Sequence, residues 1–323
     1  MYPLLVLLVA LATACGAGPP PPPAEAAPAL PTAQDIDGAG ARTISAAPSP
    51  DWAVAAAGSV WVSGVGPGLT RYDATTGAPT GEVAVYSVCS SMDRGFGSVW
   101  AMSCDYSAPQ LVRVDEKTGA QTARIALPTR LPAESSVGAG EGTVWVLSAD
   151  SPRQLVGVDP STNKVARTLA APDGAVAVRA GLGSVWVTVS TPGEVVRIDP
   201  ASGAVAARVA VGRGTSFLAL GPAAVWALNS SDGTVSRVDA RTNSVVATIP
   251  VAPGRIAGGE IAAAADAVWV RVTGDAVAVR IDPRTNAVVD RFGPGAGSGG
   301  VAIADNSVWI TAHDTRTIWR LPR

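Results

Sequence analysis

The side chains of this chain that could do chemistry stand at fixed distances before regularly spaced tryptophans. Trp52, Phe217 and Glu260 each lie nine residues before such a tryptophan, and Asp93 and Arg179 each lie seven residues before one. Two acids, an arginine and two aromatic rings gathered in one pocket would hold a small ligand or a peptide. Around a divalent metal ion, the same carboxylates would serve acid–base chemistry.

His313 is the only histidine, and it stands next to Asp314 in the segment TAHDTR. A histidine beside a carboxylate suggests proton transfer. Adjacent residues of a strand or loop usually point apart, however, so we interpret His313 as a solvated loop residue that borders the pocket. No serine sits in a nucleophile elbow, and the acids Asp93 and Glu260 belong to distant repeats. The sequence therefore identifies no catalytic set and no metal site.

The tryptophans belong to a repeated unit of about 40 residues, a spacing typical of propeller blades. Each sits in a phrase such as GLGSVWV (181–187), and successive copies are 39 to 45 residues apart. An Arg-x-Asp phrase, a turn such as RTN and a closing apolar run follow in most units. One unit thus predicts four antiparallel strands, which make one blade. The seven tryptophans are Trp61, Trp100, Trp145, Trp186, Trp226, Trp269 and Trp309.

Seven units predict an all-β fold, a seven-bladed β-propeller over residues 41–323. The last unit stops at TIWRLPR (317–323), before its closing strand, whereas ARTISA (41–46) has the pattern of a closing strand and precedes the first unit. We expect residues 41–46 to complete the last blade, so that the ring has no free edge. The tryptophans should act as wedges between neighbouring blades.

The aspartate of each Arg-x-Asp phrase starts the turn that follows. Its carboxylate can accept hydrogen bonds from backbone amides two residues on, so we interpret these aspartates as turn formers. Calcium ligation is the alternative, although one aspartate per blade would keep the carboxylates apart.

The residues nine and seven positions before each tryptophan should face the central channel. Strand side chains alternate between two faces, and the intervening residue, eight before the tryptophan, is apolar in every unit. We expect a ligand at the channel mouth; the alternative is that these side chains only hold water. The predicted ligand-binding residues are Trp52, Asp93, Arg179, Phe217, Glu260 and His313.

The amino-terminal segment predicts export. Residues 4–14, LLVLLVALATA, are too short to cross a bilayer as a helix and fit a cleaved signal. The sequence ATAC resembles the lipobox of bacterial lipoproteins, in which Cys15 would carry the lipid; ordinary secretion and an uncleaved form are the alternatives. We predict a signal over residues 1–15, a Pro/Ala-rich disordered tether over residues 16–40, and a cell-surface lipoprotein or a secreted protein.

Cys89 and Cys104 are the remaining cysteines, and they flank a predicted hairpin symmetrically. An exported protein meets an oxidising environment, so we expect the two to form a disulfide. Two buried free thiols are the alternative. A metal site is less favoured, because no histidine or third cysteine lies nearby in the sequence.

The net charge and the distribution of basic residues limit the classes of partner that the chain could bind. The formal net charge is −2, and the 24 basic residues are scattered along the chain. This distribution does not form the basic patch that nucleic-acid binding requires. We expect a monomer whose contact with the membrane is only through the N-terminal lipid.

Two segments resemble known repeat families. GTVSRVDARTNSVVATIPV (233–251) is similar to YVTN-type bacterial β-propeller repeats, and GLGSVWVTVSTPGEVVRIDP (181–200) is similar to repeats of virginiamycin B (streptogramin) lyases. The second resemblance implies magnesium-assisted elimination that opens a cyclic depsipeptide, with histidines and glutamates on one face. Because His313 is the only histidine, no lyase residue can be carried over.

The sequence therefore favours an exported, lipid-anchored binding module without a cofactor, with an unknown protein, peptide or small molecule as its partner. The alternative is a carbon–oxygen lyase that uses Glu260, Asp93 or His313 around magnesium. A purely structural envelope protein is the third hypothesis.

Overall fold

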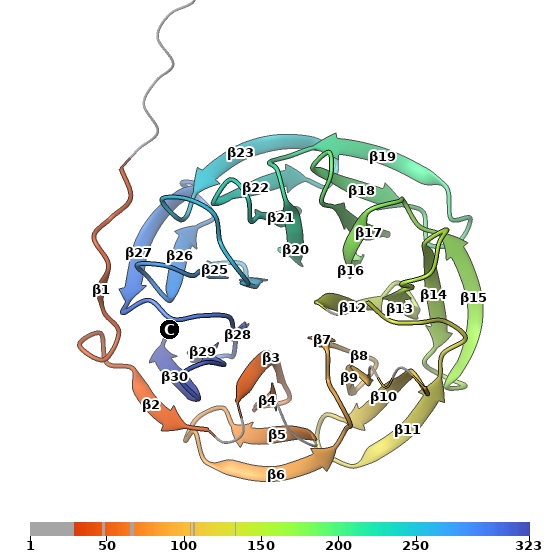
Figure 1. The fold of residues 1–323 in the computed structure, drawn as a ribbon, viewed down its shortest axis with the longest axis horizontal. Helices are drawn as coiled ribbons and strands as arrows, with labels where there is room; N and C mark the ends of the chain where they lie inside the picture. The colour runs from red at the N-terminus through yellow and green to blue at the C-terminus, as the bar shows by residue number, and fades with distance from the viewer. Residues whose placement is uncertain (1–28, 47–48, 65–67, 104, 106, 133) are drawn as a thin grey trace, which may run out of the picture.

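The computed structural model describes residues 29–323 apart from 47–48, 65–67, 104, 106 and 133. Within this part of the chain, every regular element is a strand, and no helix is long and apolar enough to cross a membrane. The strands form seven sheets arranged in a ring (Figure 1). The predicted seven-bladed propeller is therefore confirmed.

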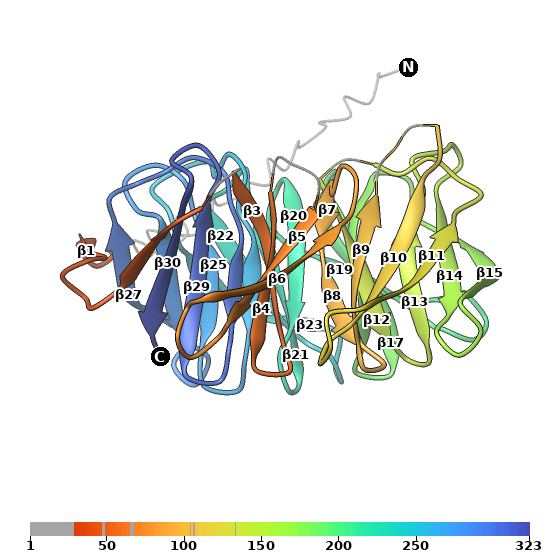
Figure 2. The same cartoon turned by 90° about the horizontal axis from the view of Figure 1, so that it is seen from below.

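Each blade places its first strand nearest the axis and its last strand at the outer rim (Figure 1). Figure 2 shows the ring from the side, with the blades standing next to one another. The first blade contains β3 (Pro50–Ala56), β4 (Ser59–Gly64), β5 (Gly68–Asp73) and β6 (Pro79–Ala84). The second contains β8 (Asp93–Gly95), β9 (Ser98–Ser103), β10 (Gln110–Asp115) and β11 (Gln121–Ala126). The third contains β12 (Ser135–Gly140), β13 (Thr143–Leu147), β14 (Gln154–Asp159) and β15 (Lys164–Ala170).

The remaining blades repeat this order. The fourth contains β16 (Ala175–Gly181), β17 (Ser184–Val189), β18 (Glu194–Ile198) and β19 (Val205–Ala210). The fifth contains β20 (Thr215–Leu220), β21 (Ala224–Asn229), β22 (Thr234–Asp239) and β23 (Ser244–Pro250). The sixth contains β24 (Ile261–Ala263), β25 (Val268–Arg271), β26 (Ala278–Asp282) and β27 (Ala287–Gly293).

The seventh blade is closed by both ends of the chain. It contains β28 (Val301–Ile303), β29 (Ser307–Ala312), β30 (Thr317–Pro322) and the N-terminal β2 (Arg42–Ser45). Strand β2 pairs antiparallel with β30, with Thr43 opposite Trp319. The prediction that residues 41–46 complete the last blade is confirmed: strands from the two ends of the chain form one sheet and close the ring.

The propeller contains residues that precede the expected boundary at residue 41. Strand β1 (Gln34–Asp35) pairs in parallel with β27 at the rim of the sixth blade, and the amide of Ile36 donates to Gly293 O at 2.8 Å. The Ile36 side chain is fully buried against Trp269 and Phe292. Part of the segment expected to be a disordered tether is thus bound to the propeller, because it carries an apolar side chain beside an unpaired strand edge.

The seven tryptophans of the repeat are wedges, as predicted. Each lies on the second strand of its blade and is at most 2% exposed. The arginine of the Arg-x-Asp phrase faces the tryptophan across the strand pair; Arg113, for example, stacks 5.0 Å from the centre of the Trp100 ring. Its Nη1 then donates to Pro160 O at 2.6 Å and to Asn163 Oδ1 at 2.9 Å in the next blade. This arginine therefore fastens neighbouring blades together.

The aspartates that follow these arginines form turns. Asp73 Oδ1 accepts hydrogen bonds from the amides of Thr75 and Thr76 at 3.0 and 2.7 Å. These bonds hold the pKa of Asp73 below its usual value. Asp115, Asp199 and Asp239 accept the same pair of amide bonds in their own turns, which confirms the interpretation of the repeated aspartates as turn formers.

Candidate functional site

Two aromatic side chains, each nine residues before a repeat tryptophan in the sequence, meet inside the ring. Trp52 comes from β3 of the first blade and Phe217 from β20 of the fifth, and their ring centroids are 5.2 Å apart with the planes tilted by 56°. They are 4% and 5% exposed. At this level the channel is filled by their contact, so both predicted ligand residues are buried against each other.

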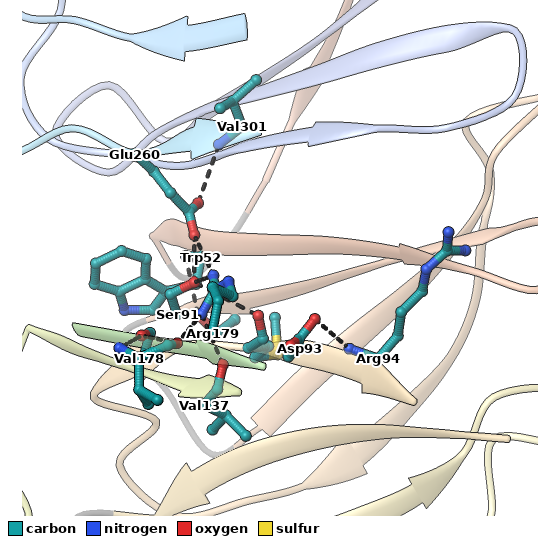
Figure 3. A network of polar contacts seen from close by, with 12 residues as sticks. Trp52, Ser91, Asp93, Arg94, Val137, Val178, Arg179, Glu260 and Val301 are labelled. Atoms are coloured by element: carbon teal, nitrogen blue, oxygen red, sulfur yellow. Dashed lines mark hydrogen bonds and ion pairs between the residues drawn. The ribbon is translucent and has the colours of Figure 1, made fainter. Parts of the chain in front are cut away.

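A buried polar network lies beside the aromatic pair (Figure 3). The Ser91 hydroxyl donates to Glu260 Oε1, and Arg179 Nη2 donates to Ser91 Oγ at 2.8 Å. Arg179 Nη2 lies 3.9 Å from Glu260 Oε1, and the amide of Val301 donates to Glu260 Oε2 at 3.2 Å. The predicted residues Glu260 and Arg179 therefore converge from the sixth and fourth blades, although they bind each other and their neighbours.

A break in the second blade places Ser91 in this network. The strand β7 (Ser90–Ser91) separates from β8 at Met92 and pairs in parallel with β12 of the third blade, with Ser91 opposite Ser136. Ser91 stands nine residues before Trp100, one of the positions expected to face the channel. Residue alternation alone predicts which face a side chain takes, but it does not show where a strand changes its partner.

Burial governs the charge of Glu260. Removal from water raises its pKa to about 7, although the Ser91 hydroxyl and the Arg179 guanidinium both favour the ionised form. A carboxyl group with this pKa is partly protonated near neutral pH. The network therefore holds one cation, Arg179, and one group close to its titration point.

Asp93 is held by backbone amides below the network. Its Oδ1 accepts from the amide of Arg94 at 2.8 Å, and its Oδ2 accepts from the amide of Ala139 in the next blade at 2.9 Å. Burial raises the pKa of Asp93, and Arg179 opposes that shift. Asp93 thus lies close to Arg179, as predicted, and serves as a link between the second and third blades.

A cavity of about 300 Å³ continues from this network along the axis. Its wall comes mostly from residues six to eight positions before the tryptophans, and Asp93, Arg179 and Glu260 contribute charged groups. A second cavity of about 500 Å³ lies at the end formed by the turns between first and second strands, and shares Ala55, Arg94, Ala263 and Ile303 with the first. The alanines that line the first cavity are Ala53, Ala55, Ala139, Ala180, Ala219, Ala262, Ala263 and Ala302.

Arg94 is the functional candidate that the sequence analysis missed. It stands six residues before Trp100, where the other six units carry only alanine, leucine or isoleucine. Its side chain is exposed and borders both cavities. Figure 3 shows it extending away from Asp93 and Arg179. The signal available in the sequence was this single charge in an otherwise apolar repeat position.

His313 lies outside the Glu260 network. It follows β29, and its amide donates to Ser298 O at 3.0 Å. Burial raises the pKa of Asp51 to about 6, with a further contribution from Glu134, and burial also raises the pKa of Glu134; the nearby His313 acts in the opposite direction on both carboxyls. The structure thus places His313 with two acids that did not figure among the predicted ligand-binding residues.

The carboxylates do not fit a magnesium site. Within residues 29–323, less the undescribed positions, no three histidine, cysteine, aspartate or glutamate side chains are grouped so that they could hold a metal ion. Glu260 accepts from Ser91 and Val301, and Asp93 accepts from two amides. Magnesium is bound by carboxylate oxygens that are free to coordinate it.

Two cysteine predictions fall on undescribed residues. Cys15, the expected lipidation site, and Cys104, the expected partner of Cys89, both lie outside the part of the chain that the structure describes. The lipid anchor and the disulfide stay predictions.

Comparison with known proteins supports the architecture. No protein-family model matches the chain, and no curated protein matches it. Among solved structures, U3-55K is similar with a TM-score of 0.71 at 9% identity, covering 88% of this chain and 98% of its own. The WD40 repeats of RRP9 give 0.71 at 10% identity, covering 91% and 99%. BamB from Moraxella catarrhalis gives 0.55 at 14% identity, covering 83% and 81%.

These structural similarities establish the propeller fold, and at such low sequence identity they show nothing about activity. The resemblance to YVTN-type repeats and to virginiamycin B lyases stays a prediction. What this chain does must therefore be argued from its own site.

Proposed function

We propose that this chain is an exported, lipid-anchored propeller that acts as a binding module, with its ligand or partner at the open end of the channel. The observation that carries the proposal is that the channel is filled by side chains at one level and hollow at the next. Trp52 and Phe217 fill one level of the channel, whereas a cavity lined by eight alanines and four charged residues is left below them. Its volume of about 300 Å³ is at the lower end of the range for small-molecule pockets.

The sequence analysis expected the ligand at the mouth formed by Trp52, Phe217 and Glu260, whereas we propose that it binds at the opposite end of the channel. Glu260, Ser91 and Arg179 satisfy one another at the filled level, so they form the blind end of the site. The accessible wall is formed by the residues nearer the turns between first and second strands, including Ala263 and Ile303. A ligand would enter from that side and meet the charged network last.

The lyase hypothesis receives no support from this geometry. Its candidate groups were Glu260, Asp93 and His313, but His313 lies with Asp51 and Glu134 instead. The two carboxylates are already occupied by hydrogen-bond donors. We therefore propose binding without catalysis, by a monomer.

Photo-crosslinking in the bacterial host tests the site. A photoreactive amino acid replaces the exposed Asn306 at the rim of the 500 Å³ cavity, and a matched variant carries it at Arg241, an exposed turn residue of the fifth blade outside the cavities. The proposal expects a discrete adduct from position 306 and none from position 241. Equal labelling at both positions would contradict it.

The export hypothesis is tested separately on the full chain. Mass spectrometry of the mature protein should find residue 15 at the N-terminus with a diacylglycerol thioether, and Cys15→Ser should release the protein from the membrane fraction. An intact residue 1 on the mature protein would refute export with a lipid anchor.

A further inference from the structure

Of the described charged residues that line the inner cavity, all but one are engaged by hydrogen bonds. Arg179 donates to Val137 O at 2.7 Å and to Ser91 Oγ at 2.8 Å. Glu260 and Asp93 each accept two hydrogen bonds. Among the described residues, the Arg94 guanidinium makes no hydrogen bond and no ion pair, although Asp93 is its sequence neighbour. The uncommitted charge of the channel is therefore positive.

The entrance adds no competing anion inside the channel. Arg323 borders the outer cavity and is paired with Asp266, while its Nη1 donates to Ala304 O at 3.2 Å. Asp305 lies at the rim of the outer cavity and is exposed, and it does not line the inner one. An anion that passed the rim would face Arg94 first.

The walls limit what else the ligand can carry. The residues around Arg94 at the same level are methyl-bearing or apolar: Ala55, Ala139, Ala180, Leu220, Ala263 and Ile303. Side chains at this level offer no hydrogen bond, so their contacts favour an apolar chain; the charged groups of Asp93, Arg179 and Glu260 line the same cavity away from this level. An arginine beside such an apolar level matches a ligand with one charged end and an apolar stem.

We infer that the channel receives the anionic end of an apolar chain, a carboxylate or a phosphate, which Arg94 binds. This inference rests on the proposed function, since it names the ligand class of the same channel. A free C-terminus of a partner protein and a small monocarboxylate present the same group, and the two sources need separate probes.

Methyl NMR on the full chain, labelled at its alanine methyl groups, tests the inference. The probes are butyrate, inorganic phosphate, tetra-alanine with a free C-terminus and tetra-alanine amide. Butyrate or free tetra-alanine should shift the Ala139 and Ala263 signals at millimolar concentration, and the amide should not. Butyrate binding alone indicates a small carboxylate, binding of the free peptide indicates a C-terminal tail, and phosphate binding indicates a phosphorylated ligand.

Arg94→Ala should weaken binding about ten- to hundred-fold, the expected effect of losing a charge-assisted hydrogen bond. Arg94→Lys should retain most of it, because the positive charge stays. Arg241→Ala, which removes an exposed arginine outside the channel, is the matched control and should bind as the unaltered chain does.

Equal binding of the amidated and free peptides would overturn the inference, as would unchanged affinity in Arg94→Ala. Failure of every probe up to about 10 mM, well above the range of specific binding, would also overturn it. If position 306 still gave a crosslinked partner, the proposed function would stand without this ligand class.

Discussion

Ser91 stands between Glu260 and Arg179, donating its hydroxyl hydrogen to the carboxylate and accepting a hydrogen bond from the guanidinium at 2.8 Å. The two charged groups are 3.9 Å apart, and their side chains are only 4% and 13% exposed. They come from blades that are not neighbours in the ring. The blind end of the channel is thus a buried contact between three blades, and its charge state depends on pH.

Glu260 should make stability fall as pH rises. Its carboxyl titrates at about 7 in the folded chain and near 4.5 when exposed, so unfolding releases a proton between those values. The unfolding free energy should therefore decrease from about pH 4.5 to about pH 7 and stay lower above it. Because glutamine does not titrate, the stability of Glu260→Gln relative to the unaltered chain should improve across this window.

Urea unfolding at pH 5 and pH 8 measures the effect. Glu82→Gln, which makes the same change at an exposed glutamate of the outer strand β6, is the matched control. Parallel pH profiles for Glu260→Gln and the unaltered chain would contradict the prediction.

The contact between Trp52 and Phe217 should be worth measurable stability. Each ring is buried, so Trp52→Ala and Phe217→Ala should each reduce the unfolding free energy by about 3–5 kcal/mol. The ring centroids are 5.2 Å apart, so the two side chains interact. The double variant should therefore lose less unfolding free energy than the two single variants together, with a coupling of about 0.5–1.5 kcal/mol. Denaturant midpoints of the four proteins give the cycle, and strict additivity would show that the rings do not interact.

Ile36 should stabilise the ring from outside the predicted domain. Its side chain is fully buried against Trp269 and Phe292, so Ile36→Ala should cost about 2–4 kcal/mol. Val246→Ala shortens a side chain that is 51% exposed on the outer strand β23 and should leave the thermal midpoint nearly unchanged. Equal midpoints for the two variants would mean that the segment before residue 41 contributes nothing.

Arg113 should fasten the second and third blades. Arg113→Ala removes the stacking on Trp100 and the bonds to Pro160 O and Asn163, at a cost of about 2–3 kcal/mol. Lysine should not restore this stability, because it cannot stack its charge and donate to two acceptors in one plane. Chemical denaturation of both variants, with the exposed Arg241→Ala as control, checks the prediction; full rescue by lysine would disprove it.

The repeat could be predicted because it is local. The tryptophan phrase and the Asp73-type turn each depend on residues within one unit, and each was found where expected. The closing strand 41–46 could also be predicted, because the last unit lacks the strand that this segment supplies. Which channel residues touch could not be predicted. Trp52 meets Phe217 rather than a ligand, and Ser91, on the strand β7 that pairs with β12, bonds to Glu260 of the sixth blade.

Seven blades, their four strands and the wedge role of Trp61 and its equivalents were determined by the sequence alone, since a period of about 40 residues repeats one pattern of burial. The tertiary structure decided where the channel is blocked, why Ile36 is buried, and that Arg94 is the charged residue of the inner cavity left without a side-chain partner among the described residues. Ring closure brings together side chains from distant blades, and their mutual contacts depend on distances around the axis that no spacing along the chain encodes.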